Sequence, residues 1–112
     1  MKAPQEAMLL RVFVGEHDRH GHAPLHEAIV QKAREQGLAG ATALRGVLGY
    51  GASSVVHTAK ILELSEDLPM VVEIVDTEAK IEGFLETLDG MMSSGLVTLE
   101  KVRVLQYGTP GR

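Results

Sequence analysis

The chain of 112 residues has no cysteine and no tryptophan, and only 4% of its residues are aromatic. Without cysteine there are no disulfides, thiolate metal ligands or cysteine nucleophiles, which fits a reducing compartment. No apolar run reaches the roughly 18 residues that span a bilayer. The opening stretch "MKAPQEAMLLRVFVGE" carries one lysine and then acids, unlike a signal peptide. We therefore expect a cytoplasmic protein that does not insert into a membrane.

Clustered positive charge is also missing. The 11 lysines and arginines are spread singly along the chain, and the formal net charge is −4. Because binding to a phosphate backbone needs clustered cations, nucleic acid is not expected as a partner. Hydrophobic residues make up 45% of the chain, enough for a folded core. By its length the chain is one domain, residues 1–112, with its core between about 8 and 107.

Hydrophobic periodicity predicts four strands and two helices. Short apolar runs predict strands at 8–16, 69–77 and 96–107, and the stretch 40–51 predicts a strand that runs into a glycine-rich exit. Helical spacing predicts one helix at 24–37, between Pro24 and Gly37, and a second from an N-cap at Thr77 to Gly95. In the last strand the alternation of apolar and polar residues shifts by one position between Leu99 and Val102, which predicts a bulge near Glu100 and Lys101. The order β-α-β-β-α-β predicts an α+β, ferredoxin-like sandwich with both helices on one face of an antiparallel sheet.

The predicted strands are apolar on both sides, so a single copy would leave one sheet face uncovered. Uncovered apolar faces usually mark an interface, and we expect a homo-oligomer. Residues 49–68 form an unusually long connection between the second and third strands, which indicates a functional segment. At its base Gly49 and Gly51 flank Tyr50, where we expect positive φ and backbone amides close to a ligand.

Four stretches carry a specific resemblance: "LLRVFVGEHDR", "PLHEAIVQKAREQGLAGATALRGVLGYG", "HTAKILELSEDLPMVVEIVD" and "GLVTLEKV". In this order and spacing they resemble a family of small uncharacterised bacterial and archaeal PII-like proteins, over roughly residues 8–107. The resemblance implies a PII-like fold, a compact homotrimer and nucleotide-sized clefts between subunits. It places the 49–68 segment where PII proteins carry their long T-loop.

The PII glycine-rich phosphate loop, Gly-Asp-Gly-Lys, is not present. Its place reads "SSGLVTLEK", with one glycine and without that lysine. The resemblance therefore leaves two kinds of effector open, a nucleotide with a short phosphate chain (AMP or ADP) or a different small ligand, with no cofactor required. It implies a sensor that signals through its long loop to a regulated partner protein, and not an enzyme. The candidate ligand-binding residues are Arg45, Gly49, Tyr50, Gly51, His57 and Lys60.

Three of these side chains are open to more than one interpretation. Arg45 lies inside an apolar strand and must reach solvent, a carboxylate or a bound anion, and an intersubunit salt bridge and a phosphate contact fit equally well. His57 fits contact with a ligand or a neighbouring subunit better than catalysis, because no nucleophile and orienting acid accompany it. Lys60 fits a phosphate contact and a solvated side chain equally well. A nucleotide-processing enzyme is a further alternative, but the loop lacks the paired carboxylates or metal motif that it needs.

Four of the five histidines fall in "EHDRHGHAPLH": His17, His20, His22 and His26. A zinc or copper site needs three or four ligands converging on one ion, and this spacing does not enforce convergence. We interpret the segment as a polar loop leading into a helix. The alternative function is a metal-binding ferredoxin-fold trimer of the metal-tolerance kind, with these histidines as ligands.

Overall fold

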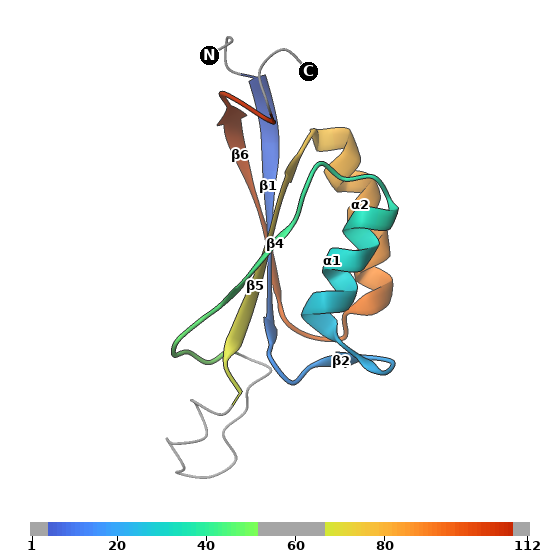
Figure 1. Cartoon of the computed structure of the whole chain (residues 1–112), viewed down its shortest axis with the longest axis vertical. Coiled ribbons are helices and arrows are strands. Elements are labelled where there is room, and N and C mark those ends of the chain that lie inside the picture. Colours follow the sequence, from blue (N-terminus) through green and yellow to red (C-terminus); the bar gives the residue numbers. More distant parts are fainter. Residues whose placement is uncertain (1–4, 52–66, 109–112) are drawn as a thin grey trace.

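A computed structural model describes residues 5–51 and 67–108, and these form a helix-on-sheet sandwich. The main sheet has the order β4-β5-β1-β6, with every pair antiparallel. Its strands are β1 (Gln5–Gly15), β4 (Thr42–Arg45), β5 (Pro69–Asp76) and β6 (Leu96–Val104). Helices α1 (Leu25–Glu35) and α2 (Glu78–Met91) lie side by side on one face of this sheet (Figure 1). The predicted α+β ferredoxin-like fold is confirmed.

The helix ends follow the local signals in the sequence. Pro24 is the N-cap of α1, and Gly37, just past its end, has a φ of +76°. This left-handed conformation is easy for glycine and strained for most other residues. Thr77 caps α2, where its side chain accepts a hydrogen bond of 3.3 Å from the amide of Lys80. Both predicted helices are therefore confirmed, with ends within a few residues of those expected.

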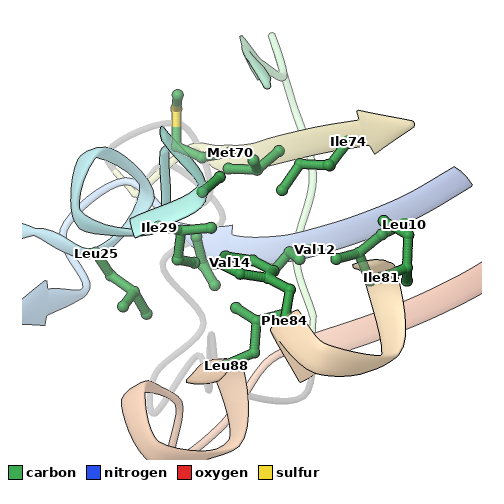
Figure 2. Close-up of a cluster of buried hydrophobic side chains, with 12 residues drawn as sticks. Leu10, Val12, Val14, Leu25, Ile29, Met70, Ile74, Ile81, Phe84 and Leu88 are labelled. Carbon is green, nitrogen blue, oxygen red and sulfur yellow. The ribbon is translucent and has the colours of Figure 1, made fainter. Parts of the chain in front are cut away.

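The core lies between the helices and the facing side of the sheet (Figure 2). Alternate residues of the two central strands point toward the helices: Leu10, Val12 and Val14 from β1, and Met70, Val72 and Ile74 from β5. The helices contribute Leu25, Ile29, Ala33, Ile81, Phe84 and Leu88. No polar or charged residue is buried among the described residues, so apolar packing alone holds this core.

The opposite face of the sheet has no cover from residues 5–51 and 67–108, the part of the chain that the structure describes. Here Leu9, Arg11 and Phe13 are only half-buried, and Leu44 and Leu96 on the two edge strands are exposed. Both helices pack on the same side of the sheet, as predicted, so the second apolar side of the first strand is only half-buried in a single chain. An apolar face with no cover remains for a partner to bury.

Strand β6 pairs with β1 without a break from Leu96 to Val104. The predicted bulge near Glu100 and Lys101 is wrong: these residues pair in register with Leu9 and Met8. The register places Val97 and Leu99 on the helix side of the sheet, where their partners on β1 are Val12 and Leu10. It places Val102 on the opposite side, where its partner is Ala7. Along this edge strand the apolar side chains therefore change from one face of the sheet to the other, and this change explains the shift in the apolar pattern of the sequence.

The second strand lies within the predicted stretch 40–51. It spans Thr42–Arg45, and the glycine-rich exit begins directly after it, at Gly46. The chain that follows is described to Gly51 and again from Asp67, so most of the long 49–68 connection lies outside the described residues. No helix in the described part of the chain combines the length and apolar character needed to cross a membrane.

Candidate functional site

The predicted ligand residues follow the end of β4, at the base of the long connection. Arg45 ends the strand, and Gly49, Tyr50 and Gly51 come shortly after it. Tyr50 is exposed and makes no hydrogen bond in the described structure. His57 and Lys60, the other two candidates, lie outside the described residues. The structure therefore bears on four of the six candidates.

Arg45 has a partner within its own chain. Its guanidinium forms an ion pair with the carboxylate of Glu16, which is 18% exposed while the Arg45 side chain is 62% exposed. The backbone of Glu16 is fixed as well, since its amide donates to the carbonyl of Leu68 over 2.8 Å. Glu16 therefore joins the start of the long connection, at Arg45, to its exit, at Leu68. This intrachain partner was not among those that the sequence suggested.

Acidic groups dominate this end of the sheet. Asp18 accepts from the amide of Gly15 over 2.8 Å, and Asp67 accepts from the amide of His17 over 3.0 Å. The imidazole Nδ1 of His17 lies 3.7 Å from the same Asp67 oxygen. Of these carboxylates only that of Glu16 contacts Arg45 within the described residues. Arg45 is thus already paired, which makes it a weaker partner for a phosphate than a free arginine.

The glycines here act through close packing and not through unusual backbone angles. A Cβ on Gly46 would lie 2.6 Å from the Cγ of Pro69, and one on Gly49 would lie 3.1 Å from the same atom. Neither Gly49 nor Gly51 has a positive φ, and nothing lies within 4 Å of a Cβ on Gly51. The expectation of positive φ at these positions is therefore wrong. Gly46, which the sequence analysis did not select, is the most tightly packed of the three.

The four clustered histidines do not converge. The polar segment forms a two-stranded hairpin of β2 (Arg19–His20) and β3 (Ala23–Pro24), which turns at Gly21. His20 and His22 are exposed on this hairpin, His17 faces Asp67, and His26 lies in the first turn of α1. Within residues 5–51 and 67–108, no group of three or more histidine and acidic side chains is placed to hold a metal ion. The geometry gives the metal-binding alternative no support.

A groove that the sequence analysis missed lies at the opposite end of β4. It has a volume of about 670 Å³ and draws its lining from the starts of β1 and β4 and the ends of β5 and β6. The members that matter chemically are Thr42, Glu73, Val75, Asp76 and Tyr107. The phenol of Tyr107 donates to the carbonyl of Ala39 over 2.6 Å, and the amide of Ala39 donates to Asp76 over 2.9 Å.

These two hydrogen bonds fix the turn that enters β4, and the small residues at 39–41 leave room beside it. The run "AGA" before a strand was the one sequence signal of this groove. A cleft of this size, mainly apolar with a few fixed polar groups, has the character of a small-molecule site.

An ion network crosses the uncovered sheet face beside this groove. The guanidinium of Arg11 bonds to Glu73 over 2.8 Å and to Glu100 over 3.2 Å. The hydrogen bond to Glu73 raises the pKa of Arg11 above its ordinary value, with the charges of Glu73 and Glu100 acting in the same direction and desolvation opposing them. Glu73 therefore belongs both to this network and to the groove wall.

Comparison with known proteins identifies relatives over nearly the whole chain. A "UPF0166 protein" of Aquifex aeolicus is 41% identical over 97 residues, covering 87% of this chain and 91% of the relative. A UPF0166 protein of Methanocaldococcus jannaschii is 29% identical over 105 residues, covering 93% and 96%.

Two solved structures share the fold at low identity. A putative PII-like signaling protein from Thermus thermophilus has a TM-score of 0.64 at 14% identity, covering 92% of this chain and 93% of the other. CPII, a nitrogen regulatory PII-like protein from Thiomonas intermedia bound to ADP, AMP and bicarbonate, has a TM-score of 0.58 at 14% identity, covering 93% and 92%. The predicted resemblance to small PII-like proteins is confirmed. Residues 7–104 match the family DUF190, "Uncharacterized ACR, COG1993", and the chain belongs to this family.

Proposed function

We propose that the protein is a PII-like sensor that binds an adenine nucleotide in clefts between the subunits of a homotrimer. The groove at the start of β4 is the observation that carries this proposal. It opens beside the uncovered face of the sheet, so a second copy packed on that face would close it. Its volume lies within the range of about 300–1,000 Å³ that is usual for small-molecule sites. The same fold in CPII holds ADP and AMP, which supports this class of ligand.

A ligand in the groove would have to extend past the edge of β4 to reach the candidate residues at the other end of the strand. Three residue steps, about 10 Å along the strand, separate Thr42 in the groove from Arg45, and the register places Arg45 on the other face of the sheet, with Met70. A nucleotide with its base in the groove would extend toward Tyr50 and the long connection. The missing Gly-Asp-Gly-Lys loop and the pairing of Arg45 with Glu16 both favour AMP or ADP over ATP. In this proposal the connection, with His57 and Lys60, carries the signal to a regulated partner protein, and no reaction is catalysed.

Thermal unfolding with and without nucleotide tests the proposal. A ligand at a hundredfold excess over its dissociation constant stabilises the folded state by about 2.7 kcal/mol. At millimolar nucleotide and a dissociation constant of about 10 μM, we expect Tm to rise by several degrees. AMP or ADP should raise it at least as much as ATP.

Val75→Arg, which fills the groove, should abolish the shift, while Gln31→Arg on the exposed side of α1 should keep it. If none of the three nucleotides raises Tm, the nucleotide proposal is wrong.

A further inference from the structure

Exposed large apolar side chains of the described residues are concentrated at the two edges of the sheet. Of ten such residues, nine belong to two short segments. One segment runs from the edge strand β4 into the connection and holds Leu44, Val47, Leu48 and Tyr50. The other is the edge strand β6 with its extension, and holds Leu96, Val97, Leu99, Leu105 and Tyr107. The outward surfaces of the helices have none, so the unburied apolar surface lies on two opposite flanks of the molecule.

The flank at β6 is hollowed. A second groove, of about 560 Å³, lies between the C-terminal half of α2 and the start of β6. Its floor is apolar, with Leu85, Leu88, Met92 and Val97. Its rim carries two carboxylates, Glu86 and Asp89, and neither forms an ion pair within the described residues.

The flank at β4 projects. Val47 is 92% exposed and Leu48 is 69% exposed, just beyond the end of the strand. Arg45 lies two residues before Val47, and its side chain is 62% exposed despite its ion pair with Glu16. A guanidinium has five N–H donors, so it can bond to further carboxylates while it contacts Glu16.

The projecting segment and the groove lie at the same level of the sheet. Arg45 pairs with Met70, which pairs with Val14. The neighbouring Phe13 pairs with Leu96, which lies in the chain between Gly95 and Val97 of the groove lining. Both segments are thus at the end of the sheet where β4 finishes and β6 begins (Figure 1). A rotation about an axis parallel to the strands, without a shift along that axis, would bring one copy's segment to the next copy's groove.

We infer that Val47 and Leu48 of one copy insert into the groove between α2 and β6 of the next copy, in a head-to-tail contact. Both surfaces are apolar, and the exposed guanidinium of Arg45 beside the inserted segment keeps donors, besides those used by Glu16, for the carboxylates on the rim of the groove. Head-to-tail contacts generate closed rings when the rotation closes without translation, and open filaments when it does not. This inference rests on the proposed assembly and names the surfaces that hold it together. It gives the 45–51 segment a role in assembly that does not depend on a ligand.

Cross-linking tests the contact directly, because the chain has no native cysteine. In a Val47→Cys/Asp89→Cys variant, one cysteine lies on the inserted segment and the other on the rim of the groove. A short bismaleimide, which tolerates a looser geometry than a disulfide, should convert the protein into covalent trimers on a denaturing gel. A symmetric two-fold contact would stop at covalent dimers. The control variant Val47→Cys/Lys32→Cys, with the second cysteine on α1, should stay largely monomeric on the gel. Dimers alone, or no cross-linking above the control, would overturn the inference.

A charge substitution gives an independent measurement. Val47→Glu places a carboxylate opposite Glu86 and Asp89. It should raise the protein concentration at which half of the trimer has dissociated by about tenfold or more. Because Val47 is 92% exposed, the fold itself should be unaffected. Gln31→Glu adds the same charge on α1 and should leave assembly unchanged. An unchanged mass for Val47→Glu across a dilution series, or a monomeric parent protein, contradicts the contact. If covalent trimers form but no nucleotide raises Tm, the ligand proposal fails and the contact stands.

Discussion

Gly95 combines two constraints that no other residue type meets. Its φ is +117°, and an added Cβ would lie 2.7 Å from the carbonyl oxygen of Phe13. We expect Gly95→Ala to lower the free energy of unfolding by more than about 1 kcal/mol, measured by urea denaturation. Gly83→Ala is the matched control, because nothing lies within 4 Å of its added Cβ. Equal stability of Gly95→Ala and the parent protein would contradict the geometry at this turn.

The residue scale is also where the sequence was least informative. It predicted that Arg45 must reach solvent, a carboxylate or a bound anion, but the partner, Glu16, lies 29 residues away and follows another strand. It placed positive φ at Gly49 and Gly51, whereas the close contact is between Gly46 and Pro69. Spacing along the chain says little about which residues meet across a sheet. Contacts between side chains distant in sequence depend on strand register, which a pattern of residue types does not specify.

At the scale of the element, α2 is stabilised by its cap and weakened by its glycines. Thr77→Ala removes the acceptor for the amide of Lys80 and should cost about 1 kcal/mol. Gly83→Ala, in an exposed part of the helix interior, should instead stabilise the protein by up to about 1 kcal/mol. Urea denaturation of both variants checks the opposite signs. A loss of stability in Gly83→Ala would mean that another chain approaches this face of α2 closely.

Helices were better predicted than strands for a physical reason. Helix ends are set by local residues such as Pro24, Gly37 and Thr77, so the sequence contains the signal. Strand ends depend on the neighbouring strand. Strand β4 ends at Arg45 because its partner β5 begins at Pro69. Strand β6 pairs with β1 in register throughout, although its apolar side chains change from one face of the sheet to the other. The order of elements was enough to predict the fold, but not the extent of each strand.

At the scale of the whole molecule, the uncovered sheet face was foreseen and the grooves were not. Apolar strands with two helices for cover imply an uncovered side, whatever the details of packing. The groove at the start of β4 gathers residues from both ends of the chain, from Gln5 to Tyr107, so no continuous stretch of sequence contains it. The ligand proposal therefore depends on the structure alone, whereas the assembly proposal has support from both the sequence and the structure.

Arg11 distinguishes an uncovered face from an assembled one. It lies at the centre of this face, between Glu73 and Glu100. On the surface of a monomer such an ion pair contributes little, so Arg11→Met would leave stability almost unchanged. In a trimer that buries this face, the substitution would leave two carboxylates without their cation. Removing one partner of a buried pair is strongly destabilising, and we expect the concentration for half-dissociation to rise about a hundredfold.

Light scattering over a dilution series measures this change. Three chains of 12.1 kDa give an expected parent mass of about 36 kDa. Lys32→Met is the control, because it breaks the exposed Lys32–Glu35 pair on α1, away from the proposed interface. If Arg11→Met and Lys32→Met both keep the parent's mass at every concentration, the sheet face is not the interface. The head-to-tail contact between the two flanks would then have to hold the copies together without it, and the groove at the start of β4 would lose the wall that a second copy was proposed to provide.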